Sequence, residues 1–223
     1  MKHILIILMA AALTLMSACT GGRKTNTAAS GDEDIALSCY RLWCEQNNRD
    51  EGNLQPSDSP LSVEFTIPVD EETLFSGYVA CYPMEDGAWL MILAQGGGDG
   101  EYSSEKYDTY IFKNGTLEEV NGILPVPPLG LLLDGECVKG KDVSKLRSAY
   151  KQRPYDYLFY GFYPDKKIVV PVLHSQNYID DESAGIWNES VEECATPFEF
   201  LPVYKWNGKD FIQGPSVEFY PGF

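Results

Sequence analysis

The sequence is poor in histidine and in positive charge. It has two histidines, and its 17 lysines and arginines face 33 acidic residues, which gives a formal net charge of −16 at pH 7. Histidine-based metal sites need several imidazoles at set spacings, and nucleic-acid binding depends on cationic side chains that displace counterions from phosphates. We therefore expect no metal site, no cofactor and no nucleic-acid partner.

The common catalytic motifs are also missing. His174 and Ser175 are adjacent in a predicted strand, where their side chains would point to opposite faces, which disfavours a Ser–His pair. The glycine run at 95–100 lacks the Lys and Ser or Thr of a phosphate-binding loop, and the acidic cluster at 180–182 lacks the ligand spacing of a calcium loop. Paired carboxylates for glycoside hydrolysis are defined by their separation in space, so a hydrolase of this kind stays an alternative.

The most specific motif lies at the start of the chain. Lys2 precedes an apolar run over residues 4–15, and Ser17 and Ala18 stand directly before Cys19. A basic start, an apolar segment too short to span a bilayer and small residues before a cut site are typical of a secretory signal peptide. With a cysteine at its end, the segment resembles the lipobox of bacterial lipoproteins.

The lipobox resemblance implies that residues 1–18 are removed and that Cys19 is acylated as the first residue of the mature chain. Acyl chains on Cys19 would anchor the protein in the membrane. Thr20, rather than Asp, follows Cys19, which in lipoprotein sorting implies the outer membrane, on its periplasmic face or at the cell surface. With no other motif present, the chain resembles uncharacterised envelope lipoproteins of the Bacteroidales.

The cysteines after Cys19 are odd in number, so at least one stays free or pairs between chains. They are Cys39, Cys44, Cys81, Cys137 and Cys194. On a continuous helix, residues five apart have Cα atoms about 8 Å from each other, beyond the reach of a disulfide. We therefore expect Cys39 and Cys44 not to pair, and the sequence does not assign the other connectivities.

Residues 19–29 are rich in small and polar types and are interpreted as a flexible tether, with a globular region over 30–223. Ser30 and Glu33 form a capping-box pattern that predicts a helix ending near Asn47. Its buried stripe is expected to contain Ala36, Cys39, Tyr40 and Trp43.

A second short helix is predicted between Asp142, as its cap, and Pro154, as its end. Its expected buried stripe consists of Val143, Leu146 and Tyr150. Both helices are short enough that we expect them to lie against a sheet.

The remaining sequence alternates short aromatic and β-branched runs with turn residues, which predicts antiparallel strands. Asn114–Gly115 and Asn207–Gly208 each follow such a run, and Asn-Gly is the strongest signal of a type I′ hairpin. Strands are expected at 61–69, 77–83, 88–95, 107–113, 116–120, 129–133, 155–160, 168–176, 198–206 and 209–213.

These elements predict an α+β fold, with predominantly antiparallel β meanders and two short helices. The landmarks recur in the same order, so one hypothesis is a duplicated helix-plus-meander unit with halves at 30–125 and 140–223. A β-sandwich is the alternative architecture.

The long acidic loop at 176–196 carries two large aromatic residues, Tyr178 and Trp187. Long loops are often functional, and aromatic side chains can anchor a protein partner or stack on a sugar, so both are candidate ligand-binding residues. The alternative is that both rings close the edge of the core. We expect a lipid-anchored, non-catalytic binding module for a glycan or protein ligand, with the carboxylate-based envelope hydrolase as the alternative.

Overall fold

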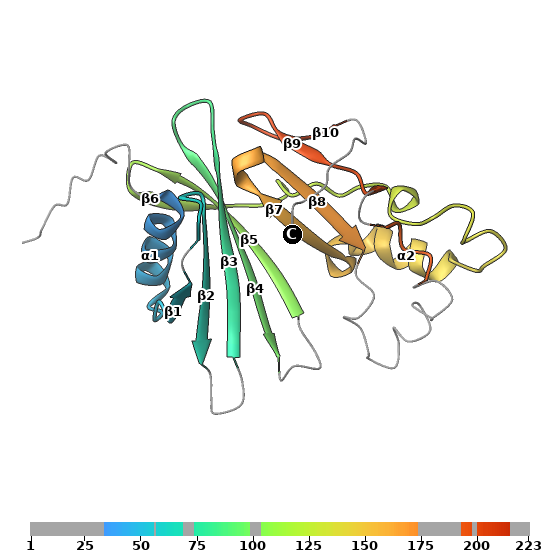
Figure 1. Cartoon of the computed structure of the whole chain (residues 1–223), viewed down its shortest axis with the longest axis horizontal. Helices are drawn as coiled ribbons and strands as arrows, with labels where there is room; N and C mark the ends of the chain where they lie inside the picture. Colours follow the sequence, from blue (N-terminus) through green and yellow to red (C-terminus); the bar gives the residue numbers. More distant parts are fainter. Residues whose placement is uncertain are drawn as a thin grey trace, which may run out of the picture. The chain divides into compact units, whose positions relative to one another are not determined.

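The structure is a computed structural model of the 223-residue chain, and it describes residues 34–55, 57–68, 74–98, 104–173, 193–197 and 200–214 (Figure 1). All of these residues lie in one compact unit that follows Gly31. Among them, no helix is both long and apolar enough to cross a membrane.

The first helix, α1 (Ile35–Asn47), buries the predicted stripe of Ala36, Cys39, Tyr40 and Trp43. Its cap differs from the prediction. Asp34 is the N-cap, and its carboxylate accepts a hydrogen bond of 2.9 Å from the backbone N–H of Leu37. An acidic cap satisfies the first-turn N–H groups directly, so the helix begins after Asp34 and not after Ser30, which lies outside the described residues. Asn48 ends the helix in the left-handed region, with φ 50°.

A six-stranded antiparallel sheet follows, in which the strands pair in chain order. Its strands are β1 (Asn53–Gln55), β2 (Ser62–Pro68), β3 (Leu74–Pro83), β4 (Trp89–Gly98), β5 (Ser104–Lys113) and β6 (Thr116–Val120). The type I′ prediction is confirmed at Asn114–Gly115, where φ is 52° and 75°. The sheet adds one element that was not predicted, the three-residue strand β1.

Both faces of the six-stranded sheet are buried along its central strand β4. Along β4, Leu90 and Ile92 belong to one core cluster, and Met91 and Leu93 belong to the other. Such strict alternation is the side-chain period of a strand. The cluster that contains Met91 also contains the buried stripe of α1, so α1 covers one face of the sheet (Figure 1).

The second sheet has four antiparallel strands in the order β10-β9-β8-β7. They are β7 (Leu158–Tyr163), β8 (Ile168–Leu173), β9 (Tyr204–Trp206) and β10 (Phe211–Gln213), and helix α2 (Ser144–Gln152) precedes them. Leu146 and Tyr150 of α2 are buried as predicted, whereas Val143 is half-buried and forms the N-cap. Asp142 accepts a hydrogen bond of 3.0 Å from the N–H of Ser144.

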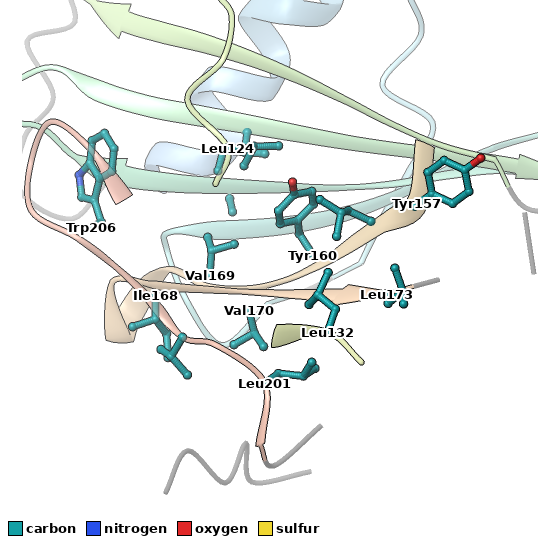
Figure 2. Packing of buried hydrophobic residues seen from close by; sticks show 14 of the residues in the cluster. Leu124, Leu132, Tyr157, Tyr160, Ile168, Val169, Val170, Leu173, Leu201 and Trp206 are labelled. Carbon is teal, nitrogen blue, oxygen red and sulfur yellow. The ribbon is translucent and has the colours of Figure 1, made fainter. Parts of the chain in front are cut away.

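The two sheets share one core. Leu90 and Ile92 of β4 lie in the same cluster of buried residues as Leu158, Tyr160 and Val169 of the second sheet. Figure 2 shows Val169 and Val170 pointing to opposite sides of β8, with Leu201 on the side of Val170. The four-stranded sheet is therefore also buried on both faces at β8.

The predicted α+β class with antiparallel meanders is confirmed. The facing sheets share the packing of a β-sandwich, but α1 covers the outer face of the larger sheet. The duplication stays a hypothesis, because a helix precedes a meander in both halves but one meander has six strands and the other has four.

One predicted strand, 129–133, is wrong, and another, 155–160, is a strand only from Leu158 on. Residues 129–133 form the 3-10 helix η1 (Leu129–Leu131) and a single bridge at Leu133, and 155–160 begins with the 3-10 helix η2 (Pro154–Tyr157). Pro154 takes the first position of η2, which its fixed φ suits, and Pro128 is the N-cap of η1. Neither proline can donate an N–H to a strand ladder. A third 3-10 helix, η3 (Pro164–Lys166), connects β7 and β8.

The second Asn-Gly turn also differs from the prediction. Gly208 has φ 101°, but the φ of Asn207 is not positive, so the turn is not type I′. The Asn207 side chain accepts hydrogen bonds of 2.8 Å from the N–H groups of Lys209 and Asp210. This capped turn has four residues instead of the predicted two, so β10 begins at Phe211 and not at Lys209. β9 is shorter than predicted at its other end, where it begins at Tyr204.

One disulfide joins Cys137 and Cys194, with a Cα–Cα distance of 5.3 Å. Cys39, Cys44 and Cys81 are free and buried. The expectation that Cys39 and Cys44 do not pair is confirmed, and free thiols remain as the odd count requires.

Candidate functional site

The three residues that the sequence singled out, Cys19, Tyr178 and Trp187, lie outside the described residues, as does His174. Their predicted roles in lipidation and ligand binding stay predictions. Within the described ranges, no group of three or more His, Cys, Asp or Glu side chains is placed to hold a metal ion.

A groove with a volume of about 420 Å³ lies where β2 and β3 of the larger sheet meet β7 and η3 of the smaller one. We call it the inter-sheet groove. Its lining residues come from both sheets and from the segment before β2: Ser57, Asp58, Ser59, Ser62, Glu64, Tyr78, Phe162, Tyr163, Pro164, Asp165 and Lys166. Because residues far apart in sequence form its walls, the groove exists only in the packed fold.

Serine hydroxyls shape one end of the groove. Ser57 and Ser62 share a hydrogen bond of 2.9 Å between their hydroxyls, and Ser59 accepts one of 3.1 Å from the N–H of Leu61. The Ser59 hydroxyl also donates across the groove to the carboxylate of Asp165, over 2.9 Å. This last contact links two segments 106 residues apart and fixes the segment before β2 against η3.

Aromatic rings form the floor. Tyr78 on β3 and Phe162 on β7 are stacked, with ring centroids 6.3 Å apart, and Phe162 also contacts Tyr160 and Tyr107. Stacked and edge-on rings hold one another in place with little freedom. At the η3 end, the ammonium of Lys166 lies 5.8 Å from the centroid of the Tyr163 ring.

The groove is acidic. Asp58, Glu64 and Asp165 are all exposed carboxylates. Burial raises the pKa of Tyr78, and the negative charges of Glu64 and Asp165 raise that pKa further, while a hydrogen bond with Ser62 opposes the shift. Tyr78 therefore presents a neutral hydroxyl at physiological pH, in a field set by the two carboxylates.

A second hollow of about 220 Å³ lies beside the β3–β4 and β9–β10 turns. Trp206 donates from Nε1 to the carbonyl of Pro83 over 2.6 Å, and Glu85 donates from its backbone N–H to the carbonyl of Gly208 over 3.3 Å. A side chain at residue 208 would meet Glu85, because a Cβ there would lie 2.7 Å from its Cγ. These contacts join two turns, so the hollow is interpreted as a packing feature.

The inter-sheet groove has the chemistry of a binding site. It combines fixed rings, hydroxyls and exposed carboxylates, and binding sites usually pair apolar walls with a few placed polar groups. Sequence reasoning missed it because Tyr78 was interpreted only as a strand residue and Phe162 fell between the predicted strands 155–160 and 168–176. The one available signal was the repeated Gly-aromatic pair that each belongs to, Gly77–Tyr78 and Gly161–Phe162.

No protein-family model and no curated protein matches the chain. One solved structure to which it is similar is a domain of an uncharacterized protein from Porphyromonas gingivalis W83, a member of the Bacteroidales. The two are 9% identical, the match covers 82% of this chain and 98% of that one, and the TM-score is 0.45. A similarity at this level carries no argument about function.

Proposed function

We propose that this protein is a lipid-anchored envelope protein that presents the inter-sheet groove to a ligand and does not catalyse a reaction. The anchor is Cys19, acylated after removal of residues 1–18. The Cys137–Cys194 disulfide supports export, because disulfides form and persist in oxidising compartments outside the cytosol.

The observation that carries the binding role is the groove itself. Its aromatic floor is held by ring contacts on both sheets, and its carboxylates face solvent. The proposed ligand-binding residues are therefore Tyr78 and Phe162, in addition to the candidates Tyr178 and Trp187 from the sequence. A preformed site of this kind loses little entropy when a ligand binds.

Exposure of the carboxylates supports binding over hydrolysis. A glycosidase needs one carboxyl group kept protonated by apolar surroundings and a second carboxylate nearby. Asp58, Glu64 and Asp165 all face solvent instead, and Asp165 accepts a hydrogen bond from Ser59.

The anchor is tested with Cys19→Ala in cells fed a clickable fatty acid. We expect the wild-type protein to carry the label and to sediment with membranes, and the variant to lose both properties. Thr20→Ala is the matched control, since it leaves the thiol in place. Label or membrane sedimentation retained by Cys19→Ala would refute lipid attachment at this residue.

The binding role is tested by hydrogen exchange on the mature chain with Cys19→Ser, in the presence of defined glycans and peptides. A ligand of this site should slow exchange in β2, β3 and β7 around the groove. The same mixtures are assayed for cleavage products. Turnover of any glycan would replace the binding role with the hydrolase alternative, and protection confined to other elements would remove the groove from the proposal.

A further inference from the structure

We propose that the inter-sheet groove binds the ammonium or guanidinium group of a lysine or arginine in a basic peptide segment. This inference rests on the proposed binding function and names its ligand class. Three features of the groove support it: its charge, its aromatic faces and the hydroxyls beside them.

The charge of the groove favours a cation. Three carboxylates, Asp58, Glu64 and Asp165, line it against one ammonium, Lys166, so its formal balance is 1 − 3 = −2. Within the described part of the chain, neither Asp58 nor Glu64 is in a salt bridge. The whole chain, at −16, would also attract basic partners from a distance.

The aromatic faces already receive a cation from within the chain. Lys166 places its ammonium 5.8 Å from the Tyr163 ring centroid, which is the range of a cation–π contact. Tyr78 and Phe162 offer further rings in the same groove, next to the carboxylates. A guanidinium can stack on such a ring while its edge donates to a carboxylate.

The hydroxyls favour a peptide over a free polyamine. Tyr78, Ser57 and Ser59 bring hydroxyls to the groove wall. A hydroxyl both donates and accepts, although Ser59, which donates its proton to Asp165, can only accept from a ligand. A peptide supplies carbonyl and N–H partners for these groups, whereas an alkyl polyamine supplies no acceptor. A neutral glycan could use the hydroxyls and rings, but it would leave the negative charge of the groove without a counterpart.

The test measures binding of acetylated pentaarginine amide to the mature chain carrying Cys19→Ser, by titration calorimetry. Asp58→Asn combined with Glu64→Gln should weaken binding about tenfold, since each lost ion pair is worth up to about fivefold in affinity. The matched control, Glu45→Gln combined with Glu118→Gln, removes the same charge from exposed sites outside the groove and should change affinity less than about twofold. Circular dichroism and melting temperature confirm that both variants are folded.

Three further variants separate the contributions of Lys166 and Tyr78. Lys166→Gln should strengthen pentaarginine binding about threefold, because a competing cation leaves the groove. Tyr78→Phe keeps the ring and should bind within about threefold of wild type, whereas Tyr78→Leu should lose about fivefold.

Several results would overturn the inference. Equal losses from the groove and control pairs would mean diffuse attraction to an acidic surface. Spermidine binding as tightly as pentaarginine would mean that no peptide is recognised. A glycan that binds the groove unaffected by Asp58→Asn and Glu64→Gln would replace the basic peptide while leaving the proposed binding function intact. If neither basic peptides nor glycans bind, both proposals fail.

Discussion

Loss of the Cys137–Cys194 disulfide should destabilise the folded protein strongly. The bridge spans 57 residues, and closing a loop of that length lowers the entropy of the unfolded chain by an amount worth about 4 kcal/mol at 25 °C. That is a large part of the roughly 5–15 kcal/mol by which domains are usually stable.

The native structure around the bridge does not depend on the sulfur atoms alone. Backbone N–H groups of Asp134 and Thr196 donate to the carbonyls of Cys194 and Leu132, over 2.8 and 2.9 Å. These bonds should keep the native arrangement after reduction, so the lost stability arises in the unfolded state. A longer, freer unfolded chain also exposes more surface, so the denaturant m-value should rise.

The assay is urea unfolding of the mature chain with Cys19→Ser, with and without a phosphine reductant. Reduction should lower the free energy of unfolding by about 4 kcal/mol, and Cys137→Ser with Cys194→Ser should show the same loss and no further response to reductant. A thiol assay on unfolded protein should count the three free cysteines before reduction and two more after it. A loss below about 1 kcal/mol would refute the unfolded-state argument.

Three other perturbations have calculable outcomes. Gly77→Ala would place a Cβ against the Phe65 ring and 2.8 Å from the Ala94 carbonyl oxygen, so the free energy of unfolding should fall by about 1–3 kcal/mol. The control Gly130→Ala should show no such loss, because its Cβ would meet nothing within 4 Å. Asp34→Ala should cost about 1 kcal/mol and Asp34→Ser much less, measured by urea unfolding, because serine still caps the helix; equal losses would contradict the capping role. Alkaline titration should unfold the protein, because burial raises the pKa of several core tyrosines. Above about pH 10 these tyrosines ionise in the unfolded chain but not in the folded one. The free energy of unfolding should therefore fall by roughly 1.4 kcal/mol per tyrosine per pH unit until the pH reaches the folded-state pKa. The tyrosines concerned are Tyr82, Tyr150 and Tyr160. Absorbance at about 295 nm should show that they ionise as circular dichroism is lost, and ionisation well before unfolding would contradict the raised pKa values.

Local patterns in the sequence predicted the elements whose structure is set locally. The stripe from Ala36 to Trp43 repeats at helical spacing, and Asn114–Gly115 can adopt a type I′ turn without help from the rest of the chain. The predicted start at Ser30 was too early, because the carboxylate of Asp34 caps the first turn by accepting from the N–H of Leu37. The Asn207 turn was missed because its side-chain hydrogen bonds favour a longer loop.

The groove was beyond sequence reasoning for a different reason. Tyr78 and Phe162 are separated by a helix and several strands, and they meet only because two sheets pack face to face. Their side chains look like core residues in the sequence, and in part they are. Residue type and strand period give the face on which a side chain lies, but they do not give the partner across the interface.

The Ser59–Asp165 hydrogen bond has a thermodynamic consequence. It links the segment before β2, which leads into the larger sheet, to η3, which connects β7 and β8 of the smaller one, at one end of the groove. A ligand that contacts both walls can bind only while the sheets are packed together, so by mass action it must oppose their separation. A ligand at 100 times its dissociation constant would add about 2.7 kcal/mol to the folded state. Occupancy of the groove would therefore be measurable as protection of the whole domain against proteases.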